Sequence, residues 1–117
     1  MASLQPYAER VRKRQAALER GLRRFLETCR NDATVLAVYV HGSFASGNIG
    51  PTSDLDLLVI RRTSLSRSER YVDLVLAARA GIPLDVLVVT PEEFASKLPL
   101  TTYGATLLAT IRRVDAA

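Results

Sequence analysis

The chain has 117 residues, of which 48% are hydrophobic and 24% are charged, as is typical of soluble globular proteins. We expect a single domain over residues 1–117 and no membrane span, since the apolar runs are much shorter than the ~18 residues that a span needs. The net charge of +4 is too small to indicate a polyanionic ligand by itself. Cys29 is the single cysteine, which excludes an internal disulfide, so we expect a cytoplasmic protein with a buried, inert thiol.

The N-terminal residues 1–31 are expected to form one long amphipathic helix. Apolar side chains recur at helical spacing over residues 4–29, and the opposite face is rich in arginine. Gly21 should weaken this helix by about 1 kcal/mol relative to alanine. The basic face has two interpretations, a solvated surface with partners such as Glu19 and Glu27, or a docking surface for phosphates or an acidic protein.

Residues 35–113 are expected to form the core of the domain. Strands are predicted at 35–40, 54–60 and 84–89, where β-branched and other apolar residues cluster. A capping box at Ser66 and Glu69 predicts a helix to about residue 80. Thr90 followed by Pro91 predicts a short helix that ends near residue 97, and a last helix is predicted over 102–113. This order indicates an α/β (α+β) fold with a small mixed sheet and helices packed against it.

Three aspartates interrupt these apolar strands. Asp54 and Asp56 are two residues apart in a strand, so their side chains project from the same face. Such like charges are costly to bury unless a cation neutralises them, and Asp85 in the next strand is costly for the same reason. Together the three could hold two Mg²⁺ ions, and Asp85 could accept the proton of an attacking hydroxyl. The alternatives are a charge pair that discourages aggregation of an edge strand and, for Asp85, a cap or an arginine partner.

A Gly-Ser pair follows the first predicted strand. Gly42 would let the backbone approach a ligand closely, and Ser43 would offer a hydroxyl and a backbone N–H group to phosphate oxygens. An ordinary turn is the alternative. His41, which precedes the pair, could contact a nucleotide or serve a structural role at the end of the strand. The combination of Gly-Ser, ten intervening residues, Asp-x-Asp and a later strand aspartate is more specific than its parts.

This combination resembles the minimal nucleotidyltransferase (MNT) domain of the DNA polymerase beta-like nucleotidyltransferase superfamily. The resemblance implies that Gly42 and Ser43 bind the triphosphate, that Asp54 and Asp56 bind both metals, and that Asp85 binds the catalytic metal and acts as the base. It also implies the polymerase beta-like fold and transfer of a nucleoside monophosphate, often AMP, from an NTP to a hydroxyl, with release of pyrophosphate. MNT domains are often the antitoxin of a toxin–antitoxin pair, so a HEPN-type ribonuclease is the expected partner and a homo-oligomer is possible.

One position departs from the family pattern. Members that adenylylate proteins usually read G-S-x-A-R-G, whereas this chain reads G-S-F-A-S-G, with Ser46 in place of the arginine. An arginine there would add a fixed positive charge near the phosphates. Two functions therefore stay open: a transferase acting on a partner protein, or a catalytically weak or inactive antitoxin that occludes its toxin. Aromatic residues make up 6% of the chain and form no base-stacking pattern, which argues against a nucleic-acid substrate.

Overall fold

Four strands form one mixed sheet in the computed structural model, which describes residues 4–115 and the side chains of residues 6–115. The strands are β1 (Val35–His41), β2 (Leu55–Arg61), β3 (Leu84–Val89) and β4 (Arg112–Arg113), and their order in the sheet is β3-β2-β1-β4. β1 pairs antiparallel with β2 and β4, and β2 pairs parallel with β3. The three longer strands agree with the sequence prediction to within one residue at each end.

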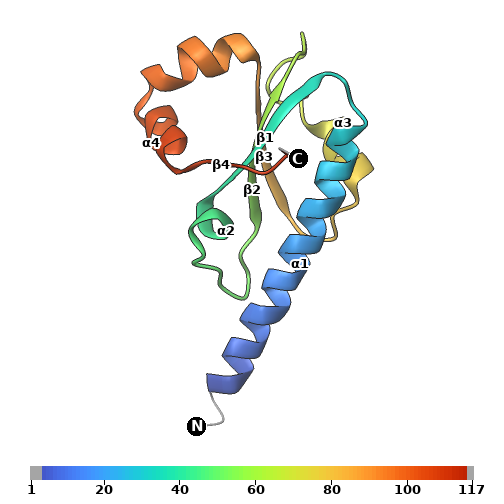
Figure 1. Ribbon diagram of the computed structural model, residues 1–117, viewed down its shortest axis with the longest axis vertical. Helices are drawn as coiled ribbons and strands as arrows, with labels where there is room; N and C mark the ends of the chain where they lie inside the picture. Colours follow the sequence, from blue (N-terminus) through green and yellow to red (C-terminus); the bar gives the residue numbers. More distant parts are fainter. Residues whose placement is uncertain (1–3, 116–117) are drawn as a thin grey trace.

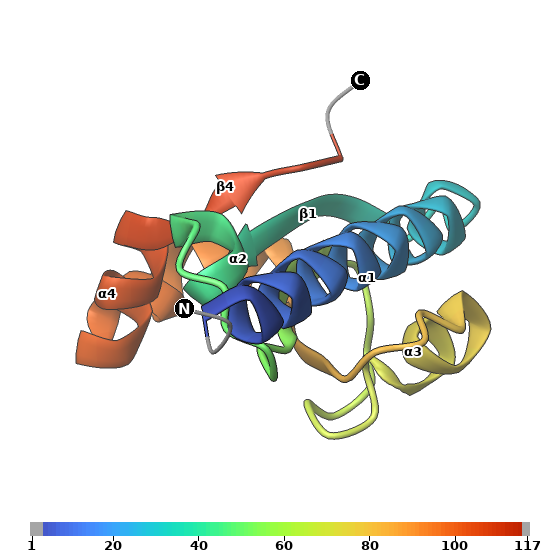
Figure 2. The ribbon, with the colours of Figure 1, turned by 90° about the horizontal axis from the view of Figure 1, so that it is seen from below.

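Helices cover both faces of this sheet (Figures 1 and 2). The helical elements are α1 (Leu4–Arg30), α2 (Gly42–Ser46), α3 (Val72–Ala78), the π-helical turn η1 (Glu93–Lys97), the 3-10 turn η2 (Leu98–Leu100) and α4 (Thr102–Thr110). α1 and α3 lie on one face, and the segment from η1 to α4 lies on the other. Among the described residues, no helix has the length and apolar character that crossing a bilayer requires.

Alternation along β2 divides the core in two. Leu57 and Val59 point toward α1 and α3, whereas Leu58 and Ile60 point toward the segment from η1 to α4. Because both faces of β2 are covered, its sequence is a continuous apolar run rather than an alternating one. Cys29 lies in the first of these clusters and is 5% exposed, which confirms that its thiol is buried.

The helix predicted from the capping box begins later than expected, at Val72. Ser66 does donate a hydrogen bond to the Glu69 carboxylate, at 2.6 Å, but the two residues close a turn instead of opening a helix. Arg70 accounts for the difference, because its side chain is buried and bonded to Glu93 at 2.6 Å. The long-range hydrogen bond of this side chain to Glu93 stabilises the turn and outweighs the local preference for a helix.

The segment that follows α3 packs closely against α1. A Cβ atom on Gly21 would lie 2.7 Å from Ile82 Cγ1, so the glycine allows a close approach that compensates for its low helix propensity. α3 ends at Ala78 rather than near residue 80, because Arg79 adopts a left-handed conformation with φ 48°. Arg24 of α1 donates a 2.9 Å hydrogen bond to the Arg79 carbonyl, which joins the two helices at this point.

The last predicted helix is also shorter than expected. It ends at Thr110, and Arg112–Arg113 instead form β4 along the edge of β1. Ile111 already has the extended backbone of a strand, and the Val114 N–H donates to the Val38 carbonyl at 3.0 Å. Pairing with β1 satisfies backbone groups that an open sheet edge would leave without partners, and this outweighs continuation of the helix.

The basic face of α1 is largely exposed. Arg12 pairs with Glu9, at 2.9 Å, one turn earlier on the helix. Glu19, one of the expected arginine partners, accepts a hydrogen bond from Gln15. An exposed pair such as Arg12–Glu9 contributes less than about 1 kcal/mol, so this pair adds little to stability.

Candidate functional site

A row of ionisable side chains crosses the sheet at one end. His41 at the end of β1 is the register partner of Asp56 in β2, and Asp56 is in turn the partner of Asp85 in β3. Register partners project from the same face of a sheet, and Asp54, two residues before Asp56, shares that face. The structure therefore brings the three predicted aspartates together on the face that α4 and the η turns cover further along.

Asp56 is the most perturbed member of this row. It is half-buried, and its pKa is raised from 3.8 to about 6. Burial is the largest cause, followed by the negative charge of Asp54, a hydrogen bond shared with Asp54, and the charge of Asp85. Within residues 6–115, no positive charge is among the causes that act on the pKa of Asp56, and a bound cation relieves such a gathering of negative charge.

The outer members of this row of side chains are accessible to solvent. Asp54 and Asp85 are exposed, and neither forms an ion pair within the described part of the chain. Among residues 6–115, no three histidine, cysteine or acidic side chains lie close enough together to hold a metal ion by themselves. The available donors are carboxylate oxygens, which suit a hard cation such as Mg²⁺ that keeps water or phosphate oxygens in its remaining positions. The chemistry of the donor set therefore fits Mg²⁺.

His41 is a further member of the row, for which the sequence left two roles open, a nucleotide contact or a structural role at the end of the strand. It is half-buried, and burial lowers its pKa although the charges of Asp85 and Asp54 act in the opposite direction. A pKa below 6.5 leaves the imidazole neutral at pH 7, with one nitrogen able to donate and the other able to accept a hydrogen bond. The pairing of His41 with Asp56 depends on strand register, for which the sequence carries no local signal.

The short helix α2 sits directly against Asp56. Gly42 begins α2 in a left-handed conformation with φ 70°, and a Cβ atom there would collide with the Asp56 carboxylate. Glycine therefore allows α2 to approach Asp56 closely and to turn away at once from β1. Ser43 follows, half-buried, and its carbonyl accepts a 3.3 Å hydrogen bond from the Ser46 hydroxyl. The Ser46 hydroxyl is thus bonded within α2.

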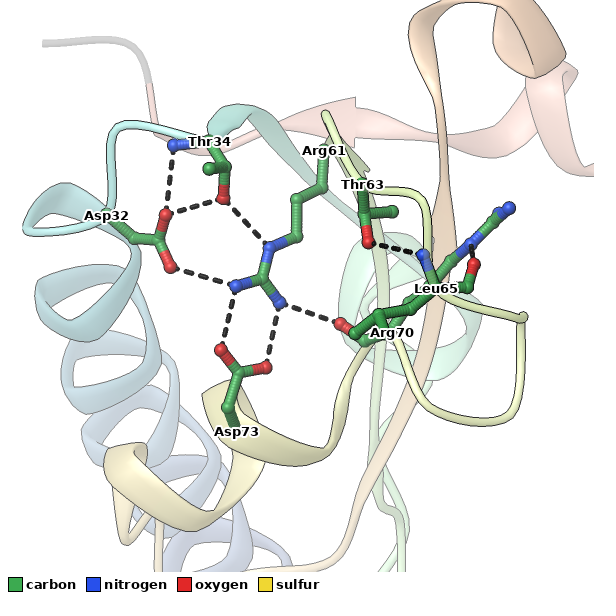
Figure 3. Close-up of polar contacts among 7 residues, drawn as sticks. All are labelled: Asp32, Thr34, Arg61, Thr63, Leu65, Arg70 and Asp73. Carbon is green, nitrogen blue, oxygen red and sulfur yellow. Dashed lines mark hydrogen bonds and ion pairs between the residues drawn. The ribbon is translucent and has the colours of Figure 1, made fainter.

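Arg61, at the far end of β2, is engaged elsewhere (Figure 3). Its guanidinium bonds both carboxylate oxygens of Asp73, at 2.7 and 2.8 Å, and one oxygen of Asp32, at 3.0 Å. It also donates to the Arg70 carbonyl at 2.7 Å and is buried, with 8% of the residue exposed. The positive charge of Arg61 is therefore neutralised inside the fold by Asp73 and Asp32.

The sheet is small and mixed, and its Asp-x-Asp lies at the start of β2. A further aspartate lies on the parallel neighbour β3, and a Gly-Ser pair follows the antiparallel neighbour β1. These features together are typical of the nucleotidyltransferase class of folds. The profile of the family described as "Nucleotidyltransferase domain" matches residues 22–108 of the chain. The chain therefore belongs to the nucleotidyltransferase domain family, and its fold is the polymerase beta-like nucleotidyltransferase fold that the motif implies.

Comparisons with individual proteins add one structural relative. None of the curated proteins matches the chain. A solved structure described as "Crystal structure of the toxin-antitoxin with AMP-PNP" is similar, with a TM-score of 0.55 and 19% sequence identity. The similarity covers 78% of this chain and 69% of the other. At this identity the likeness concerns the fold, and it agrees with the resemblance to MNT domains.

Proposed function

We propose that the chain is a Mg²⁺-dependent nucleotidyltransferase that moves a nucleoside monophosphate, AMP in the first instance, from an NTP to a hydroxyl on a partner protein. The observation that carries this proposal is the row of Asp56 and Asp85, with Asp54 beside it and Gly42 in contact with Asp56. Like charges at the end of an apolar sheet are costly without a bound cation, and clusters of such perturbed groups are typical of catalytic and binding sites.

In this proposal Asp54 and Asp56 hold two Mg²⁺ ions, and Asp85 completes the binding of the catalytic one. The ions, when bound, stabilise the charges on the attacking and leaving oxygens of an in-line displacement. Gly42 and Ser43 bind the triphosphate through backbone N–H groups and the serine hydroxyl.

The chemical step then follows from the placement of Asp85. The acceptor oxygen forms a bond to the α-phosphorus while the bond from that phosphorus to the bridging oxygen breaks, and pyrophosphate leaves with the electron pair. Asp85 takes the proton of the acceptor hydroxyl, since it is exposed and stands at the end of the row. His41, neutral beside Asp56, is placed to donate a hydrogen bond within the same site.

We infer that the partner is a HEPN-type toxin, for which this chain is the antitoxin. The motif resemblance and the fold shared with a structure described as a toxin–antitoxin support this assignment. The test is transfer of label from ATP labelled at the α-phosphate, in Mg²⁺, to the protein encoded by the neighbouring gene.

The wild-type chain should label that protein, and Asp54→Asn/Asp56→Asn should reduce labelling to background. Glu9→Gln/Glu19→Gln removes the same number of charges from the exposed surface of α1 and should label as the wild type does. Undiminished labelling by the double aspartate variant would overturn the assignment.

Occlusion of the toxin without catalysis is the second candidate. Residue 46 favours it. No cation stands there to bind phosphate, and the Ser46 hydroxyl is already bonded to the Ser43 carbonyl. Ribonuclease assays of the toxin separate the two functions. If Asp54→Asn/Asp56→Asn/Asp85→Asn still inhibits the toxin fully, occlusion is sufficient, whereas loss of inhibition in this folded variant assigns the effect to catalysis.

A further inference from the structure

A cavity of about 470 Å³ opens beside Asp85, on the same face as the row of carboxylates. Its lining comes from three parts of the chain: the loop after β2, the edge strand β3, and the segment from η1 to α4. The residues that matter for the argument are Arg67, Asp85, Leu87, Lys97, Leu98 and Tyr103. No local pattern in the sequence indicates this cavity, because its walls meet only through tertiary packing.

The cavity lies at the end of the row opposite to α2. β3 is an edge strand, and crossing the sheet from β1 leads from His41 to Asp56 and then to Asp85, beyond which the cavity begins. In an in-line displacement the attacking oxygen and the leaving pyrophosphate lie on opposite sides of the phosphorus. If the triphosphate lies against Gly42, as in the proposed function, the acceptor must arrive from the side of Asp85 and hence through this cavity.

The surface around the cavity has the chemistry of a protein-binding site. Arg67 and Lys97 are exposed, and neither forms an ion pair within the described residues. Tyr103 is 67% exposed, and Leu100, three residues before it, is 82% exposed. Exposed large apolar side chains beside unpaired cations fit a partner that brings apolar and acidic side chains, since charge complementarity directs such encounters.

The outer edge of β3 adds backbone groups to this surface. The Leu55 N–H donates to the Pro83 carbonyl at 3.2 Å, so the odd-numbered residues of β3 direct their backbone groups toward β2. The even-numbered residues direct theirs outward, as the Val88 carbonyl does when it accepts from Arg70 at 3.3 Å. Val86 lines the cavity on this outer edge. Because Arg70 already uses the Val88 carbonyl, an extended segment laid along β3 would pair with the outward backbone groups of Leu84 and Val86 as an added strand.

We propose that the cavity is the acceptor site, and that it binds an extended acidic segment of the partner protein whose hydroxyl side chain reaches Asp85. This inference rests on the proposed function for its chemistry, because Asp85 takes the hydroxyl proton in the transfer described above. Binding of the segment itself needs neither nucleotide nor metal, so it can be measured separately.

The experiment uses two fluorescein-labelled peptides of equal length, a tyrosine flanked by glutamates and a tyrosine flanked by lysines. Fluorescence anisotropy should show that the full chain binds the glutamate peptide and that Arg67→Glu/Lys97→Glu weakens this binding at least tenfold. Arg62→Glu/Arg112→Glu changes the net charge equally at exposed positions outside the cavity and should leave binding within twofold. Amide chemical shifts in the presence of the peptide should change at residues 85–88 and 97–103.

Three results would overturn the acceptor site. The two charge variants could weaken binding equally, the lysine peptide could bind as tightly as the glutamate peptide, or the amide shifts could avoid β3 and η2. The occupant could also be the triphosphate, in which case Arg67→Glu/Lys97→Glu would weaken binding of Mg²⁺ and α,β-methylene-ATP as strongly as it weakens peptide binding. Failure of the proposed function would give a different result. Nucleotide binding would survive in Asp54→Asn/Asp56→Asn, and peptide binding would be unaffected.

Discussion

Replacing Gly42 with alanine tests how closely α2 must approach Asp56. The substitution has two effects. Alanine adopts the left-handed backbone at this position, with φ 70°, only at a cost of about 1–2 kcal/mol. Its Cβ atom also collides with the Asp56 carboxylate. Gly47→Ala is the matched control, because φ there is 82° but nothing lies within 4 Å of the added atom. Both variants share the backbone strain, and only Gly42→Ala displaces the carboxylate.

The two effects are separated by two measurements. Thermal unfolding in EDTA should lower the Tm of Gly47→Ala by roughly 4–8 °C, at about 4 °C per kcal/mol for a domain of this size, and that of Gly42→Ala by at least as much, since its Cβ atom also displaces the carboxylate. Calorimetric titration with Mg²⁺ and α,β-methylene-ATP should show a further loss for Gly42→Ala alone, about 10–100-fold in affinity, as is typical when the support of a metal ligand is disturbed. If Gly42→Ala binds this nucleotide as tightly as Gly47→Ala does, Asp56 is not part of the binding site as described.

Further predictions concern the stability of the fold around the site. Because the pKa of Asp56 is raised to about 6, the ligand-free protein loses stability as the pH rises from about 4 to 6. Asp56→Asn should therefore stabilise the protein at pH 8, by about 1 kcal/mol after allowance for solvent screening, and have little effect on stability at pH 4. Urea unfolding with EDTA measures both effects. Equal effects at the two pH values would contradict the assigned charges. Arg61→Met should lower the free energy of unfolding by about 3 kcal/mol because it leaves carboxylates without their buried partner, whereas Asp73→Asn, at a side chain 62% exposed, should cost about 1 kcal/mol. Equal losses for these two in urea unfolding would show that Arg61 does not organise the network. Gly104→Ala should destabilise by about 1–3 kcal/mol in the same assay, despite the better helix propensity of alanine, since its Cβ would collide with the Leu98 carbonyl; a stabilised variant would contradict the close packing of α4 on η2.

The parts of the site that lie within one strand could be predicted from the sequence. Alternation alone places Asp54 and Asp56 on one face, and the apolar run around Asp85 marks a third charged position in a strand. Gly42 has the left-handed conformation that favours glycine, with φ 70°, and binding of the triphosphate there stays a prediction. These features depend on neighbours in the chain, so the chain order is enough to find them.

The parts that depend on tertiary packing could not be predicted. Asp85 faces Asp56 because β3 pairs parallel with β2 in one particular register, and His41 joins the row because β1 pairs in another. The late start of α3 has a similar cause, since Arg70 leaves the local helix pattern to bond Glu93, which lies 23 residues away in the chain. Such bonds between distant residues decide between local conformations that the sequence pattern leaves nearly equal.

The most direct test of the central claim is paramagnetic broadening of amide signals by Mn²⁺, used in place of Mg²⁺, with α,β-methylene-ATP. If Asp54, Asp56 and Asp85 share the metal site, signals of residues 41–43, 54–57 and 84–86 should broaden together, and those of α3 should not. Asp54→Asn/Asp56→Asn should abolish the broadening at all three segments. Broadening that reaches residues 54–57 but spares 84–86, or that persists in the double variant, would contradict the account.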